Sequence, residues 1–270
     1  MDRHAVALCK RDVPQARFDP DDLFAQVRSF CAEVRDGHVR DLLLGLLDDP
    51  ELGPAFRLAP AAKTIHHAWT GGLCEHTLSV LQLAWRVCDH YPQLDRDLVT
   101  AGCLLHDFGK VRELTCDGDG FAYTDEGRLV GHIVLACQLI HERARTIAGF
   151  PRQLEMHLVH LVAAHHGALE HGSPKEPQTL EALVVHALDE LDSRMAAFGA
   201  IFSRDAAAGS FTEYQRLYDR HLFKLPSWNG EPRAADARRF RGRGLYHQCS
   251  GLRPSATGDA GKAGSSGGKG

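Results

Sequence analysis

Several ionisable side chains fall at positions where helical periodicity otherwise places apolar residues. They are His76, His106, Asp107, His132, His165 and Asp189. Burying a polar group costs free energy unless it is hydrogen-bonded or bound to a metal. One such histidine by itself is most simply a satisfied core residue. Five helices that each deliver an imidazole or a carboxylate are explained together by a shared metal site.

The types of side chain indicate which metals and which chemistry. Imidazole and carboxylate without thiolate suit zinc, iron, manganese or cobalt. Two such ions bridged by a carboxylate can clamp a phosphate and polarise a water, which is the chemistry of phosphoester hydrolysis. Lys110 lies one turn beyond His106-Asp107 and is placed to neutralise charge that develops on the phosphate.

Helices must position these residues, because the apolar periodicity is helical along most of the chain. The first helix begins near Asp21, with Asp21 or Asp22 as its cap and Pro20 as a breaker before it. Asp95 caps another helix, which Gly109 closes, and Pro151 suits a first helical position. The predicted helices are 39–47, a short one within 50–60, 72–90, 96–106, 129–148, 152–165, 179–203 and 212–222.

A small β-hairpin is predicted over 113–125, where CDGDG lies between apolar residues. The fold class is therefore all-α, a helical bundle over 21–225 with one hairpin. Residues 1–20 are predicted to be an extended lead-in. Residues 226–253 form a basic extension with five arginines between 233 and 243, and the Gly- and Ser-rich residues 254–270 are predicted to be disordered.

Composition excludes some classes of protein. The net charge of −4 gives no global basic field for nucleic acid. The sequence contains no apolar stretch of about 18 residues, so no membrane span is predicted. The N-terminus lacks the apolar region of a signal peptide. The 8 cysteines form no CxxC pair, and most lie in apolar helical patterns, as expected of reduced core residues in a cytoplasmic protein.

The order His76, His106-Asp107 and Asp189, with LLHDFGK at 104–110, resembles the HD-domain metal-dependent phosphohydrolases. The further His132 and the pair His165-His166 resemble the subset that holds two metals. The resemblance implies that His76, His106, Asp107 and Asp189 hold one metal and that Asp107 bridges. It implies that His132 and His165 hold the second, with His166 beside them as a ligand or a phosphate contact. Asp189 matches the family's distal aspartate better than Asp192.

Three longer segments, 59–80, 123–136 and 165–182, resemble YhaM-type 3′→5′ exoribonucleases, and the resemblance covers about residues 21–200. It implies a divalent-metal-dependent phosphodiesterase that acts on single-stranded RNA or short oligonucleotides. It also directs attention to Lys63, His66, His67 and Lys175 as substrate contacts. Proteins of that type usually carry an OB-fold before the HD domain. The twenty residues before the first predicted helix are too few for that barrel, so we expect weaker affinity for long RNA.

Two other functions fit the same residues. The pocket could act on small nucleotides or cyclic dinucleotides, or the protein could be a catalytically weak metal-binding module that interacts with RNA. A complete ligand set favours an enzyme over the last of these. The sequence does not fix the native metal, the choice of RNA over DNA, or the oligomeric state.

Overall fold

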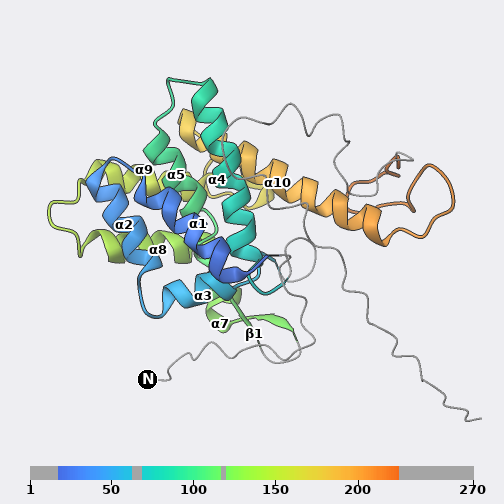
Figure 1. Ribbon diagram of the computed structural model, residues 1–270, viewed down its shortest axis with the longest axis horizontal. Helices are drawn as coiled ribbons and strands as arrows, with labels where there is room; N and C mark the ends of the chain where they lie inside the picture. The colour runs from blue at the N-terminus through green and yellow to red at the C-terminus, as the bar shows by residue number, and fades with distance from the viewer. Residues whose placement is uncertain (1–17, 63–68, 117–119, 225–270) are drawn as a thin grey trace, which may run out of the picture. The chain divides into compact units, whose positions relative to one another are not determined.

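The computed structural model describes residues 18–62, 69–116 and 120–224, and the sequence predictions for 1–17, 226–253 and 254–270 lie outside these residues. The described chain is mostly helical and contains one two-stranded antiparallel sheet, as the sequence predicts (Figure 1). The helices are α1 (Pro20–Ala32), α2 (Gly37–Leu47), α3 (Leu52–Leu58), α4 (Gly72–His90), α5 (Arg96–Leu105), α6 (Lys110–Glu113), α7 (Asp125–Leu129), α8 (His132–Ala144), α9 (Arg152–Ala163) and α10 (Leu180–Arg204). The strands are β1 (Leu114–Cys116) and β2 (Phe121–Tyr123), and a 3₁₀ turn spans Leu169–His171.

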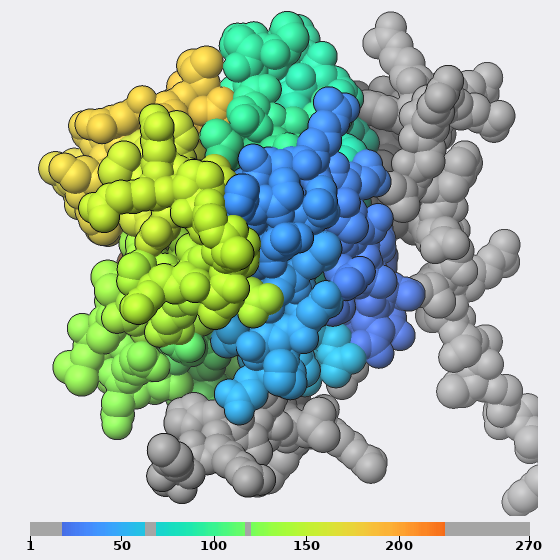
Figure 2. Space-filling model, turned by 90° about the vertical axis from the view of Figure 1, so that its left-hand side faces the viewer, coloured from blue at the N-terminus to red at the C-terminus, as the bar shows by residue number. Residues whose placement is uncertain are grey.

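The core forms around α4 and α5, which pack on each other and receive α1 and α10. Apolar side chains repeat along α4 so that Val80, Leu81 and Ala84 are fully buried, and α5 buries almost its whole length. Figure 1 shows α10 passing α4 and continuing beyond it, and Figure 2 shows α2, in blue, against the yellow-green segment that contains α8. The chemistry-bearing residues therefore start from a rigid apolar scaffold.

The cap of α1 differs from the predicted one. Asp19 caps the helix, because its carboxylate accepts a hydrogen bond from the backbone N–H of Asp21 at 2.8 Å. Pro20 is then the first helical residue, where a missing N–H costs nothing. Asp21 and Asp22 lie in the first turn, where their negative charges interact favourably with the positive end of the helix dipole.

The predicted helix 129–148 is shorter in the structure, where α8 covers 132–144 and Leu129 is the last residue of α7. Gly131, with φ of 80°, separates α7 from α8, so the direction of the chain changes immediately before His132. Pro151 likewise caps α9 from outside rather than occupying its first position. The break at Gly131 makes His132 the first residue of α8, with its backbone N–H free to bind a side chain.

Gly109 does not end its helix in the left-handed conformation that a helix-closing glycine adopts. Its φ is −61°, an ordinary helical value, and the residue is the N-cap of α6. A Cβ there would lie 2.0 Å from the carbonyl oxygen of His132 and 2.8 Å from the backbone N of Ala136. The glycine is required by the close approach of α8, which brings His132 near Asp107.

Residues 212–222 were predicted to be helical, and this was wrong. Thr212 and Leu222 pair across a turn instead: the Thr212 N–H donates to the Leu222 carbonyl at 2.8 Å, and the Leu222 N–H donates to the Thr212 hydroxyl at 3.0 Å. Isolated bridges join Phe211 to Phe223 and Gln215 to Arg220. Hydrogen bonds that pair the two ends of the segment replace the helical ones.

Two further observations bear on the setting of the protein. Of the described helices, none has both the length and the apolar character that a membrane span requires. Cysteines 31, 74, 88 and 103 carry free thiols in the core, and Cys137 carries a half-buried one, as predicted for most of the cysteines.

Candidate metal centre

The structure brings the predicted ligands together in two groups. His76 from α4, His106 at the end of α5 and Asp189 from α10 form one group. His132 from the start of α8 forms the other with His165 and His166, which follow α9. Within each group the candidate ligand atoms all lie within 4.8 Å of one another. Residues up to 113 positions apart in the sequence, His76 and Asp189, thus lie in one centre.

The first group is tightly packed and almost inaccessible to solvent. His76 Nε2 lies 3.2 Å from His106 Nε2 and 3.2 Å from Asp189 Oδ1. His106 Nε2 lies 3.8 Å from the same Asp189 oxygen. His76 and His106 are 1% and 0% exposed. Three ligand atoms that face one point in an apolar surrounding are typical of a buried cation site.

Asp107 lies between the two groups and directs one oxygen toward each. Its Oδ2 is 3.5 Å from His106 Nε2 and 3.8 Å from His76 Nε2. Its Oδ1 is 3.5 Å from His132 Nε2 and 3.8 Å from His165 Nε2. This is the arrangement expected of a carboxylate that bridges two metal ions.

The outer nitrogens of three rings are held by backbone carbonyls. His106 Nδ1 donates to the Cys103 carbonyl at 2.9 Å, and His165 Nδ1 donates to the Val162 carbonyl at 2.7 Å. His166 Nδ1 donates to the His171 carbonyl at 3.1 Å. A ring that donates from Nδ1 keeps its Nε2 lone pair for a metal. The backbone therefore selects the tautomer that a ligand histidine needs.

Carboxylates hold the other two rings. Glu113 Oε1 accepts from His132 Nδ1 at 3.1 Å and from the His132 backbone N–H at 3.0 Å. Asp192 Oδ2 accepts from His76 Nδ1 at 2.8 Å. Such carboxylate–histidine pairs orient ligand rings and raise their basicity.

The donor set fits a divalent metal, and unpartnered atoms show where it would bind. The Nε2 atoms of His132 and His165 are buried and have no hydrogen-bond partner among the described residues. A buried nitrogen left without a partner costs free energy. A cation beside Asp107 Oδ1 would satisfy both nitrogens at once.

Charges in the centre are compensated unequally. Burial by itself raises the pKa of Asp107, but Lys110, whose Nζ lies 2.6 Å from Oδ2, and His106 hold it well below its usual range. Burial lowers the pKa of His165 to about 3, so this ring is neutral and ready to bind a metal. Although burial opposes it, the hydrogen bonds with Asp189 and Asp192 raise the pKa of His76 to about 10.

Glu113 and His186 also contact the centre, and neither was predicted from the sequence. His186, on α10, donates a hydrogen bond from its Nδ1 to the His165 carbonyl at 2.8 Å. Glu113 meets His132 because the hairpin after Glu113 returns the chain and α8 packs on α6, and no spacing in the sequence signals that. His186 precedes Asp189 by one turn, so the helical period did place it near the centre.

Of the predicted substrate contacts, Lys63, His66 and His67 lie outside the described residues. Lys175 is exposed, and its charge acts on His160, whose pKa it helps to lower.

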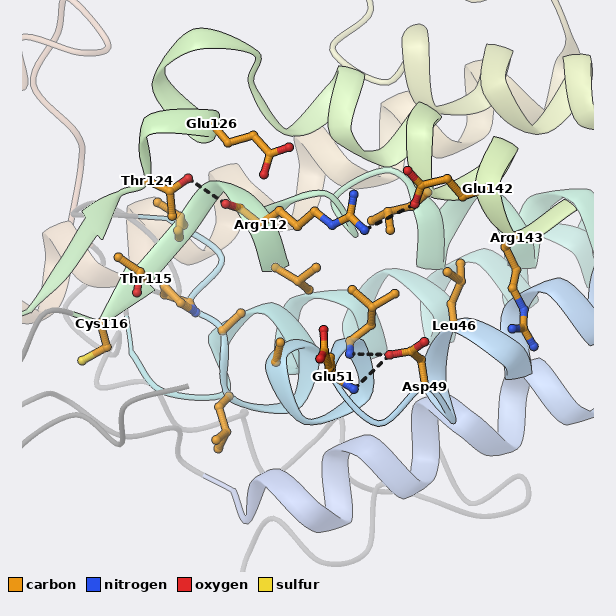
Figure 3. A pocket seen from close by; sticks show the side chains of 18 of the residues that line it. Leu46, Asp49, Glu51, Arg112, Thr115, Cys116, Thr124, Glu126, Glu142 and Arg143 are labelled. Atoms are coloured by element: carbon orange, nitrogen blue, oxygen red, sulfur yellow. Dashed lines mark hydrogen bonds and ion pairs between the residues drawn. The ribbon is translucent and has the colours of Figure 1, made fainter. Parts of the chain in front are cut away.

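A separate cavity of about 1040 Å³ lies between α3, the hairpin, α7 and α8 (Figure 3). Its lining includes Asp49, Glu51 and Glu126, together with Arg112, which lies 3.3 Å from Glu142. None of the predicted metal ligands lines it. The candidate metal centre and this cavity are therefore separate sites.

The comparisons with known proteins agree with this geometry. The family model for the HD domain matches residues 73–194. The 3′-5′ exoribonuclease YhaM of Halalkalibacterium halodurans is 36% identical over 220 residues, which are 82% of this chain and 67% of that protein. YhaM of Shouchella clausii is 34% identical over the same shares of the two chains. YhaM of Bacillus pumilus is 34% identical over 208 residues, 77% of this chain and 65% of that protein. No solved structure matches.

The HD-domain match implies that the centre binds a divalent metal, and the match spans both His76 and Asp189. These relatives are longer, and this chain covers about two thirds of their length. The chain is a metal-dependent hydrolase that belongs to the YhaM family of HD-domain proteins.

Proposed function

We propose that the protein binds two divalent ions and removes nucleotides from the 3′ end of single-stranded RNA. His76, His106, Asp107 and Asp189 would hold one ion. His132, His165 and His166 would hold the other, with Asp107 as the shared ligand. The ion would be manganese, cobalt, iron or zinc, since the donors are imidazole and carboxylate.

The observation that carries this proposal is the position of Asp107 between two groups of ligands. Its two oxygens face different histidine sets at 3.5 Å each. A single ion would not need the second set, in which the Nε2 atoms of His132 and His165 are buried without a hydrogen-bond partner among the described residues. Two ions, when bound, would polarise a phosphodiester and lower the pKa of the attacking water.

Residues of the chain have separate parts in this proposal. Asp107 fixes the distance between the two sites. Lys110 sits 2.6 Å from Asp107 and, once the ions balance that carboxylate, its ammonium is free to offset charge on the phosphate. Lys63, His66, His67 and Lys175 are proposed to contact the RNA backbone. The free thiols of the core are typical of a reducing compartment such as the cytoplasm, whereas Cys116 is disulfide-bonded.

The choice of RNA rests on the relatives, whose names describe 3′-5′ exoribonucleases. The first experiment is therefore cleavage of a 5′-labelled single-stranded RNA with Mn²⁺. We expect a ladder that shortens from the 3′ end with the wild type and no ladder with Asp107→Asn. Asp41→Asn, an exposed change on α2, is the matched control and should behave as the wild type.

A chain-length series tests the substrate class. An exonuclease should shorten oligonucleotides and leave nucleoside monophosphates intact. Turnover of mononucleotides or cyclic dinucleotides without shortening of RNA would contradict the proposal, as would an active Asp107→Asn variant.

A further inference from the structure

The turn that carries His165 and His166 is anchored to α10 by a side chain. His186 Nδ1 donates a hydrogen bond to the His165 carbonyl oxygen at 2.8 Å. The ring also lies against Gly167, where a Cβ would be 2.2 Å from His186 Cε1 and 2.3 Å from Nε2. Gly167 has a φ of 78°, so both its conformation and its close contact with the ring need a glycine.

The helix that carries His186 also carries a ligand of the other group. His186 and Asp189 are three residues apart on α10 and therefore lie on the same face of the helix. Asp189 reaches His76 and His106, whereas His186 reaches the turn beside them. One rigid helical turn thus connects the two groups of ligands.

We propose that His186 is a positioning residue that sets where His165 and His166 stand relative to the first group. It acts through the His165 backbone, because its Nδ1 is engaged with that carbonyl. His186 makes no hydrogen bond with the His165 side chain. The His165 ring donates from its own Nδ1 to the Val162 carbonyl, and its Nε2 stays available for a metal. The inference rests on the two-ion centre proposed above.

Two substitutions separate the hydrogen bond from the shape of the ring. His186→Phe keeps a planar ring against Gly167 and removes the donor. His186→Asn places an amide N–H near the position of Nδ1 and removes most of the ring. His141→Phe is the matched control, since His141 is an exposed histidine on α8 that pairs with Glu155.

The measurement is the number of Mn²⁺ ions bound per chain and their affinities, by equilibrium dialysis of the full chain. We expect two ions for the wild type, for His141→Phe and for His186→Asn. In His186→Phe one of the two should bind about ten- to a hundredfold more weakly, the usual effect of losing a group that orients a ligand. Gly167→Ala disturbs the same contact with the His186 ring and should also weaken the binding of one of the two ions.

The outcomes separate this inference from the proposed function. Normal binding of both ions by His186→Phe, or equal weakening in His186→Asn and His186→Phe, would overturn the positioning role. If the wild type binds two ions and leaves RNA intact, the proposed function fails while the expected pattern among the variants still supports His186. A wild-type chain that binds no ion would overturn both.

Discussion

His76 Nδ1 and Asp192 Oδ2 lie 2.8 Å apart, on the side of the imidazole that faces away from His106 and Asp189. Asp192 also accepts a hydrogen bond from the Ser79 hydroxyl. The carboxylate is therefore placed to orient the ring, whereas Asp189, one turn earlier, faces the nitrogen that would bind a metal. Asp189 and Asp192 lie on the same helix but contact different nitrogens of the His76 ring, Nε2 and Nδ1 respectively.

The first prediction follows from this pair. Asp192→Asn should weaken Mn²⁺ binding by about ten- to a hundredfold, because the ring loses its charged partner while all proposed ligands remain. Titration calorimetry of the metal-free protein measures this. Glu190→Gln, which disrupts only an exposed ion pair with Arg194 on the same helix, should leave the affinity unchanged. Wild-type affinity in Asp192→Asn would contradict the orienting role.

Lys110 should matter for stability most when no metal is present. Its Nζ compensates Asp107, and the two side chains are only 13% and 5% exposed. Lys110→Met leaves a buried carboxylate uncompensated, which typically costs about 3 to 5 kcal/mol of unfolding free energy. Urea unfolding in chelator should show this loss, and added Mn²⁺ should reduce it.

Arg194→Met is the control for that experiment, because its ion pair with Glu190 is largely exposed. We expect a change of about 0.5 kcal/mol or less there. An equal loss for Lys110→Met with and without metal would show that Asp107 does not contact the ion.

Gly109→Ala should destabilise the protein and Gly199→Ala should not. A Cβ at Gly109 would collide with backbone atoms of α8, which cannot move aside as a side-chain tip can. Overpacking of this kind costs about 1 to 3 kcal/mol. At Gly199, within α10, nothing lies within 4 Å of the added Cβ, so alanine should stabilise by about 0.5 to 1 kcal/mol. Thermal unfolding of both variants checks the pair, and a stable Gly109→Ala would contradict the packing of α8 on α6.

The last prediction concerns pH and His160. Burial, with His157 and Lys175, lowers the pKa of His160, whose Nε2 accepts a hydrogen bond from the Gln178 N–H at 3.0 Å. The folded state therefore prefers the neutral ring, while the unfolded ring gains a proton below its ordinary pKa of about 6.5. This contribution to stability is present above that value and is lost as the pH falls below it.

His160→Gln keeps an acceptor that does not titrate in this range. Its unfolding free energy in chelator should fall less than that of the wild type between pH 7 and pH 5. Parallel loss in the two proteins would mean that His160 does not prefer the neutral form.

Much of the helical framework was predictable because apolar periodicity and capping residues are local. The predicted helix 72–90 is α4 residue for residue, and Asp95 caps α5 as expected. The errors occur where local propensity competes with contacts from elsewhere. Gly131 breaks a continuous apolar pattern, and the pairing of Thr212 with Leu222 overrides a helical one.

The candidate residues of the metal centre can be recognised from the order and types of the side chains along the chain. A charged or polar residue on an apolar helical face is conspicuous without coordinates, since burying it requires a partner. Which atoms each of these residues faces depends on how the helices pack in three dimensions. Glu113, Asp192 and His186 owe their contacts to helices that meet from distant parts of the chain, and periodicity along one helix cannot report which atom of a neighbour lies opposite.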